Sequence, residues 1–239
     1  MNKFEKVAHR RAGKTLRVTD LSGNLLKNTK LQLKQVKHAF LFGCGAFDIN
    51  SYFETEDADK KAMYQERMDL WFDLFNYGTL PFYWGGYEPV EGEPHWQSRM
   101  AAAKLMKEKG VQVKGHPLCW HTGCVNWLMD YDNATILDKQ LKRIERDVTQ
   151  FKGTIDMWDV INEVVIMPDY DRYDNAITRI CLEHGRVNLI KKVFEEAKAA
   201  NPDSTLLLND FNTSVAYEIL IDGALQAGAP IDVIGIQSH

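Results

Sequence analysis

Two polar residues close an apolar run in the segment IDMWDVINEVV, residues 155–165. The run is typical of a buried strand, where an amide beside a carboxylate needs partners. Partial desolvation near Trp158 would favour the protonated form of Glu163, and a protonated carboxyl can act as a general acid. Asn162 could donate a hydrogen bond to a substrate hydroxyl. An ion-paired or helix-capping Glu163 is the structural alternative.

Three further apolar runs end in residues that can bind or react. Their side chains are imidazoles, amides, a carboxylate and an indole, which together can hold a polar ligand and shift protons. One such end could arise by chance, but four in succession are hard to explain by packing. The residues are His116, Trp120 and His121, then Asn209 and Asp210, then Gln237 and His239.

Strand-like and helix-like segments alternate from Ala39 onward. This order predicts parallel strands joined by right-handed crossovers, and the nearly continuous apolar character predicts a sheet covered on both faces. Strands are expected at residues 40–47, 77–84, 111–121, 155–163, 204–210 and 231–239. Helices are expected at residues 57–75, 95–110, 134–153, 185–202 and 214–230.

A doubly wound sheet and a (β/α)8 barrel both fit this alternation. No GxGxxG or GxxxxGK[ST] motif follows a strand, which weakens the nucleotide-binding version. In a barrel, chemistry gathers at the carboxyl ends of the strands, where the four polar ends lie. The sequence therefore favours an α/β fold of the (β/α)8 TIM-barrel type, with about six of the eight βα units present.

The first residues differ from the rest. KTLRVTD and KLQLKQVK alternate apolar and polar positions, and a Ser-Gly-Asn turn lies between them. We expect residues 1–38 to form an N-terminal β-hairpin extension packed on the barrel, and residues 39–239 to form an incomplete (β/α)8 domain.

Composition excludes several classes of protein. The net charge of −4 offers no basic face for nucleic acid, and no apolar run is long enough to span a membrane. The start of the chain shows no signal peptide. A cytoplasmic location is expected if this N-terminus is native, and an extracellular or periplasmic one if a signal peptide was removed.

A metal site and a nucleophilic serine or cysteine are alternative sources of chemistry. His116, His121, His239 and Asp210 could together bind zinc. However, the five-residue spacing of the first two histidines does not present both from one strand or helix, and Trp120 between them favours sugar stacking. No GxSxG is present, and Cys119 lies inside a strand. We expect no metal and no cofactor.

The segments GHPLCWH, WDVINE, LLLNDFN and IGIQSH, in this order and spacing, resemble glycoside hydrolase family 10. This family is best known for endo-β-1,4-xylanases. The resemblance covers residues from about Phe40 to His239. It implies a (β/α)8 barrel that cleaves β-1,4-linked pyranosides in an oligo- or polysaccharide with retention of configuration.

The resemblance also implies a role for each matching residue. Glu163 becomes the acid/base, which protonates the glycosidic oxygen and later deprotonates water. Asn162 holds the 2-hydroxyl of the sugar at the cleavage point, beside Gln237. His239 orients the nucleophile. The other implied residues line or support the same site: His116, Trp120 and Asp210.

The second strand departs from the family pattern. The family has a Glu-Asn pair and a nearby Lys that bind the sugar, whereas this chain reads GTLPFYWGGYEPVEG. Glu88, Pro89 and Gly92 keep the later part of the pattern. Tyr83 and Trp84 are expected to stack on the substrate instead, and a decorated xylan or another plant β-glycan becomes the expected substrate.

The family nucleophile is a Glu at the end of strand seven, which would follow His239. We therefore expect these 239 residues to be weakly active or inactive, although the parent protein is a glycosidase. Self-association or a C-terminal fragment would cover the open barrel edges. The alternative is a non-catalytic carbohydrate-binding protein on a degenerate barrel, which would still use His116, Trp120, Asn162 and Gln237.

Overall fold

The computed structural model describes residues 12–36 and 38–237. The chain divides into two compact units, Met1–Phe40 and Leu41–His239. In the first unit, Thr19 and Leu25 form an antiparallel bridge around a turn in which the Asp20 carboxylate accepts from the backbone N–H of Ser22 and Asn24. The turn lies where the sequence predicts one. The packing of this predicted hairpin on the barrel stays a prediction, and residues 1–11 and 37 lie outside the described residues.

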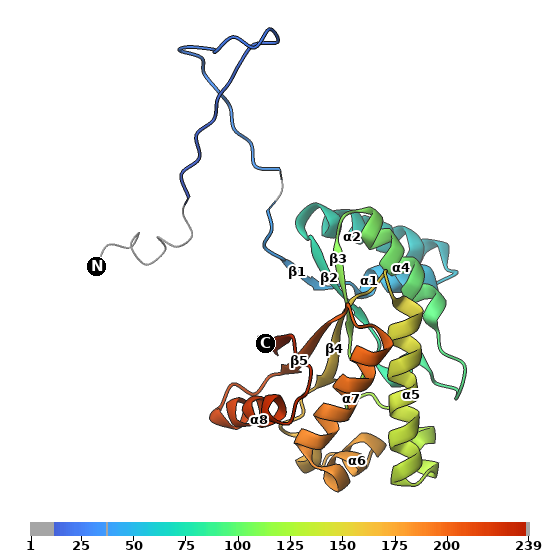
Figure 1. Ribbon diagram of the computed structural model, residues 1–239. Coiled ribbons are helices and arrows are strands. Elements are labelled where there is room, and N and C mark those ends of the chain that lie inside the picture. Colours follow the sequence, from blue (N-terminus) through green and yellow to red (C-terminus); the bar gives the residue numbers. More distant parts are fainter. Residues whose placement is uncertain (1–11, 37, 238–239) are drawn as a thin grey trace. The chain divides into compact units, whose positions relative to one another are not determined.

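The second unit is built on a six-stranded parallel sheet whose strands follow the chain order (Figure 1). Every neighbouring pair is parallel, which confirms the predicted βα repeat. The sheet is a half-barrel that matches part of a (β/α)8 barrel. The strands are β1 Gly43–Gly45, β2 Tyr77–Pro81, β3 Gln112–His116, β4 Met157–Asn162, β5 Thr205–Asp210 and β6 Val233–Ile236.

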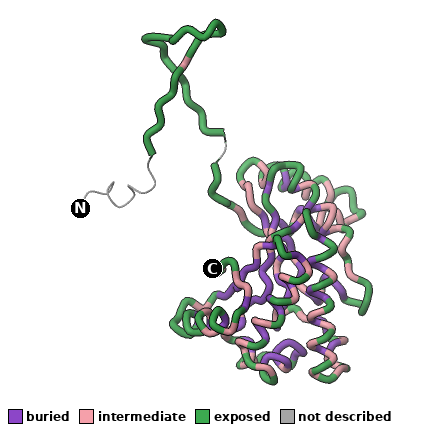
Figure 2. The backbone as a smooth tube through the Cα atoms, in the orientation of Figure 1, coloured by how far each residue is buried: buried purple, intermediate pink, exposed green. Residues whose placement is uncertain are grey.

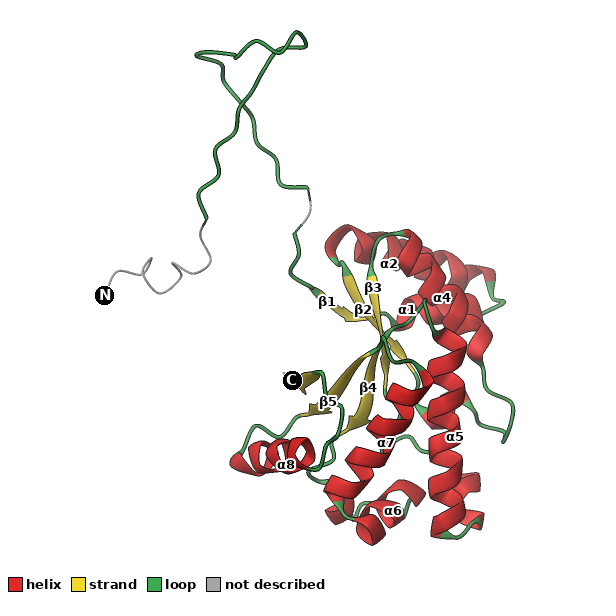
Figure 3. Ribbon diagram, viewed as in Figure 1, coloured by secondary structure: helices red, strands yellow, loops and turns green. Residues whose placement is uncertain are grey.

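Helices connect the strands, and α4, α5 and α7 lie along one side of the sheet (Figure 3). The short helices α1, α3 and α6 were not expected from the sequence. The α-helices are α1 Phe47–Glu54, α2 Ala58–Leu74, α3 Trp84–Tyr87, α4 Trp96–Glu108, α5 Asn133–Phe151, α6 Ala176–His184, α7 Arg186–Ala200 and α8 Val215–Gln226. Two 3-10 helices, η2 Asn126–Asp130 and η3 Met167–Asp169, lie in the loops after β3 and β4. No helix within the described ranges is long and apolar enough to cross a membrane.

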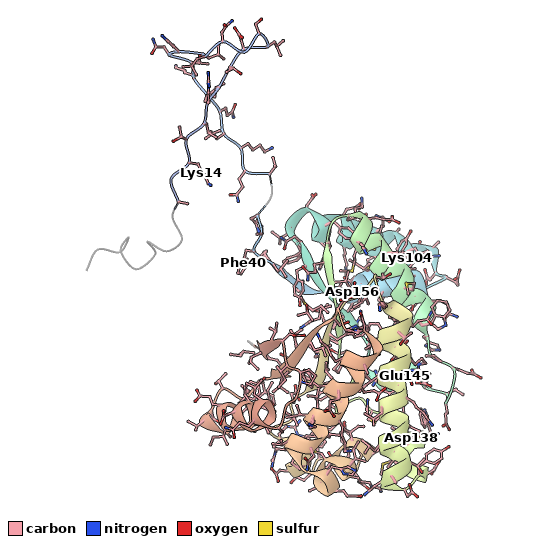
Figure 4. The ribbon with its side chains drawn as sticks, in the orientation of Figure 1. Lys14, Phe40, Lys104, Asp138, Glu145 and Asp156 are labelled. Carbon is pink, nitrogen blue, oxygen red and sulfur yellow. The ribbon has the colours of Figure 1, made fainter. Side chains whose placement is uncertain are left out.

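Helix α5 has one buried apolar face and one exposed charged face. Asp132 caps its first turn by accepting from the Thr135 N–H at 2.7 Å. Ile136, Ile144, Val148 and Phe151 are fully buried on one face of the helix, and Leu141 is partly buried. The exposed face carries charge, including Asp138 and Glu145, which are labelled in Figure 4.

Burial is greatest in the middle of the sheet and least at its ends (Figure 2). In β4, Trp158 is fully buried, and its ring lies so close to Gly115 that a Cβ there would sit 2.1 Å away. Glycine in the GHPLCWH motif is therefore a packing requirement. At the sheet end, Val233 and Ile236 of β6 remain 39% and 61% exposed.

Candidate active site

The end of β4 carries the central pair. A bulge between Asp159 and Ile161 shifts the register against β5, and bulges often re-aim side chains beside active sites. Glu163 then adopts a φ of +55°, a strained value for a residue other than glycine. Its N–H donates to the Asn209 carbonyl at 2.8 Å, which ties this strained position to β5.

The amide of Asn162 is fixed by its neighbours. Its Oδ1 accepts from Asn209 Nδ2 at 2.8 Å and from Gln237 Nε2 at 2.9 Å. A Cβ at Gly235 would lie 2.4 Å from Asn209 Oδ1, so the glycine makes room for this contact. Because both contacts use the oxygen of Asn162, its Nδ2 group remains to donate to a ligand.

The Glu163 carboxylate contacts the end of β3. Trp120 Nε1 donates to Glu163 Oε2 at 3.0 Å, and both side chains are half-buried. The indole therefore holds one carboxylate oxygen, and the other remains available for proton transfer to a substrate.

His116 is held by a buried carboxylate that the sequence analysis did not single out. His116 Nδ1 lies 2.6 Å from Asp159 Oδ2, and Lys114 Nζ lies 2.7 Å from the same oxygen. Asp159 is fully buried. An acidic residue inside an apolar strand needs buried partners, and this pattern is the signal in the sequence that could have identified Asp159. The arrangement leaves His116 Nε2 as the nitrogen that can face a substrate.

Asp210 holds the backbone of two loops. Its Oδ2 accepts from the Val165 N–H at 3.0 Å, and its Oδ1 accepts from the Asn212 N–H at 2.9 Å. It is fully buried. Because Val165 is two residues after Glu163, Asp210 supports the acid/base through the backbone of its loop.

The structure does not bring Trp84 to this site. Trp84 is 4% exposed, donates to Glu88 Oε2 at 3.0 Å and lies 4.6 Å beneath the Arg143 guanidinium. The adjacent Tyr83 lies at the site instead, with its ring 5.6 Å from Trp120 and 5.7 Å from His116. Strand β2 ends at Pro81 and α3 begins at Trp84, and the two rings have different neighbours: Tyr83 contacts Trp120, whereas Trp84 contacts Arg143.

A cavity of about 530 Å³ adjoins Glu163. It lies between the loops after β3, β4 and β5. His121 lies in its wall against Tyr170, with ring centroids 4.4 Å apart, and burial lowers the pKa of His121 to about 4. The lining residues are Trp120, His121, Thr122, Glu163, Ile166, Asp169, Tyr170, Asp171, Arg172 and Phe211.

Within the described ranges, no group of three or more His, Cys, Asp or Glu side chains is placed to hold a metal ion. His239, which was predicted to orient the nucleophile, lies outside those ranges. Of the other predicted site residues, contacts link Trp120 to Glu163, Asn162 to Gln237 and His116 to Trp120. These contacts form one polar and aromatic mouth at the carboxyl ends of the strands.

Comparison with known proteins identifies the family of this chain. The profile of glycosyl hydrolase family 10 matches residues 49–239. Endo-1,4-beta-xylanase 3 of Hypocrea jecorina is 27% identical over 164 residues, which cover 65% of this chain and 46% of that protein. Endo-1,4-beta-xylanase B of Thermotoga neapolitana is 26% identical over 199 residues, which cover 80% of this chain and 55% of that protein.

Solved structures of xylanases have a similar fold. Native xylanase 10B from Thermotoga maritima superposes with a TM-score of 0.67 at 25% identity, covering 82% of this chain and 60% of that one. Xylanase 10B from Thermotoga petrophila RKU-1, solved in complex with xylobiose, gives a TM-score of 0.67 at 24% identity, with the same coverage. The chain thus spans about half the length of these curated relatives and 60% of these structures. It belongs to glycosyl hydrolase family 10.

Proposed function

We propose that this chain supplies the acid/base and much of the sugar-binding site of a retaining glycosidase that cleaves β-1,4-linked xylan or a related plant β-glycan. The observation that carries the proposal is Glu163, which is held in a strained conformation with Trp120 on one carboxylate oxygen and Asn162 beside it. Strained backbone of this kind clusters at functional sites.

The contacts suggest how each group acts. Asn162 Nδ2 donates to the 2-hydroxyl of the sugar at the cleavage point, because Asn209 and Gln237 occupy its oxygen. His116, oriented by Asp159, lines the same sugar. Glu163 gives its proton to the glycosidic oxygen as the bond to C1 breaks, and later takes a proton from the water that attacks C1. Sugar units on the leaving-group side occupy the cavity, which reaches Glu163 but not Asn162 or His116.

A retaining mechanism needs a second carboxylate about 5–5.5 Å from the first. Asp159 already binds His116 and Lys114, and Asp210 already accepts from two backbone N–H groups. We therefore propose that neither aspartate is the nucleophile. From the resemblance to the family, we also propose that His239 orients the nucleophile and that the 239-residue chain has little or no hydrolytic activity by itself.

Strand β6 lies at an exposed edge of the sheet. Val233, Ile234 and Ile236 of β6 are all more than a third exposed, although they lie in a parallel strand of apolar residues. We propose that a further βα unit of the family barrel covers this edge. Sedimentation over a range of concentrations tests this, since a dimer of the 239-residue chain would mean that a second copy covers the edge instead.

Hydrolysis of 4-nitrophenyl β-xylobioside by the 239-residue chain, with and without sodium azide, tests the proposed chemistry. Azide can replace a missing nucleophile by attacking C1 as nitrophenolate leaves, which yields an α-glycosyl azide. We expect turnover only with azide. Turnover without azide would show that a carboxylate within the chain completes the pair. Sugar binding by a folded chain without turnover in either case would favour a non-catalytic carbohydrate-binding protein.

A further inference from the structure

Three aromatic side chains follow three neighbouring strands at the mouth. Phe47 is the first residue of α1, directly after β1, Tyr83 follows β2 and Trp120 follows β3. Because β1, β2 and β3 are adjacent and parallel, these rings lie along one side of the mouth. We call Phe47, Tyr83 and Trp120 the aromatic wall.

Tyr83 is the central ring of this wall. Its centroid lies 6.2 Å from that of Phe47 and 5.6 Å from that of Trp120, and it meets His116 edge-on at 5.7 Å. Phe47 is 45% exposed, and Tyr83 is half-buried. The wall therefore keeps apolar surface accessible beside residues that we propose to contact the sugar.

The backbone on both sides of Tyr83 is pinned. The Phe82 N–H donates to the His116 carbonyl at 2.6 Å, and the Gly85 N–H donates to the Gly123 carbonyl at 2.7 Å. A Cβ at Gly85 would lie 3.0 Å from that carbonyl oxygen, so glycine permits the approach. The loop after β2 is thus fixed against the loop after β3. Ligand binding therefore requires little further ordering of the backbone at Tyr83.

Arg143 adds a further restraint from α5. Its buried guanidinium donates to the carbonyls of Phe82, Pro117 and Leu118, the last at 2.8 Å. One cation therefore holds the backbone next to Tyr83 and next to His116. Tyr83 and His116 are consequently positioned by the same buried group.

Two carboxyl groups, those of Glu163 and Asp159, lie near enough to act on the hydroxyl of Tyr83. Burial, together with the nearby carboxylates of Glu163 and Asp159, raises the pKa of Tyr83. Its hydroxyl stays protonated at ordinary pH and can donate to a ligand. Asp159 is paired with Lys114, so the ionised form of Glu163 is the group that disfavours an anionic ligand at this position.

We propose that the aromatic wall binds a neutral pyranose of the substrate by its apolar face, with Tyr83 as the specificity-determining residue. This inference rests on the proposed function. The resemblance to the family would place Glu, Asn and Lys in this region, and the chain instead presents flat rings. Stacking on these rings, supported by the phenolic hydroxyl, replaces most of those polar contacts.

Calorimetric titration of the 239-residue chain with xylotriose tests the wall. Tyr83→Ala is expected to weaken binding about tenfold or more, while Tyr83→Phe keeps the ring and stays within about threefold. Tyr83→Leu guards against poor folding of the alanine variant and should match its loss. Phe47→Ala should cost about threefold. Replacing xylotriose with an oligosaccharide that carries a uronic acid should also weaken binding about tenfold.

Two controls separate the possible failures. Tyr131→Ala makes the same change at a ring beneath Lys139, and it should leave affinity unchanged. Asn162→Asp tests the proposed site itself. If the unaltered chain binds and Asn162→Asp loses binding, but Tyr83→Ala and Tyr83→Leu bind normally, the aromatic wall is refuted and the proposed function stands. If the unaltered chain binds no xylotriose, both are refuted.

Discussion

The mouth of the half-barrel has two unlike sides. At β4 and β5, Asn162, Asn209 and Asp210 are almost fully buried and joined by hydrogen bonds to each other, to Gln237 or to backbone. At β1 to β3, the aromatic wall is more open, and ring packing and backbone bonds hold it. We call these the polar side and the aromatic side.

The difference separates two tasks. Proton transfer needs Glu163 at a fixed position, and a satisfied buried network is rigid because each lost partner leaves a costly polar group. Stacking on a sugar tolerates small changes, because a flat apolar surface has no single required contact. Changes on the polar side should therefore affect stability or chemistry as well as binding, whereas changes on the aromatic side should mainly reduce affinity.

The largest effect is expected at Glu163. In the presence of azide, Glu163→Ala should slow release of a poor leaving group such as phenol from its β-xylobioside about 10²–10⁴-fold, since the acid is lost. Release of dinitrophenol, which needs little acid assistance, should change little. Steady-state rates for the two leaving groups check this. Equal losses for both would mean that Glu163 is not the acid.

Two substitutions at Asn162 distinguish its role in the hydrogen-bond network from its role in sugar binding. Asn162→Ala leaves Asn209 Nδ2 and Gln237 Nε2 without their acceptor, which should lower the free energy of unfolding by about 3 kcal/mol. Asn162→Asp keeps an acceptor oxygen and loses the donor, so it should cost less stability but lose as much xylotriose affinity. Urea unfolding and titration measure the two effects. Normal xylotriose affinity in Asn162→Asp would contradict the assigned donor.

The lowered pKa of His121 makes the stability of the chain depend on pH. Its pKa is about 4 in the folded chain against 6.5 in its ordinary state. The unfolded chain therefore takes up the proton first as pH falls. Stability that is present above pH 6.5 should be lost as pH falls from about 6.5 towards 4, by on the order of 2–3 kcal/mol.

Urea unfolding at pH 7 and pH 4.5 measures this loss, and His121→Gln serves as its control because glutamine does not titrate. The difference between the two pH values should shrink in the variant. An unchanged difference would assign the pH dependence to other groups.

The smallest effect is expected at Trp84. Trp84→Phe removes the hydrogen bond from Nε1 to Glu88, which should cost about 1 kcal/mol of stability. Affinity for xylotriose should stay within about twofold, because the ring packs under Arg143 outside the mouth. A tenfold loss of affinity would extend the aromatic side to Trp84.

The parallel order of the strands could be predicted because alternating apolar and amphipathic segments allow few topologies. The meeting of Asn162 with Gln237 followed from the same logic, since parallel strands end at one edge. The choice between Tyr83 and Trp84 could not be made, because it depends on where β2 ends and α3 begins. The contact of Asp159 with His116 depends on strand register and on the β4 bulge, which leave no clear pattern in the sequence.

The most direct measurement is a crystal structure of this chain with xylotriose. We expect one pyranose against the ring of Tyr83 and a sugar hydroxyl within hydrogen-bond distance of Asn162 Nδ2, so that the polar and aromatic sides hold the same ligand. A sugar bound beside Trp84, with the mouth empty, would contradict both the proposed site and the division of the mouth into two sides.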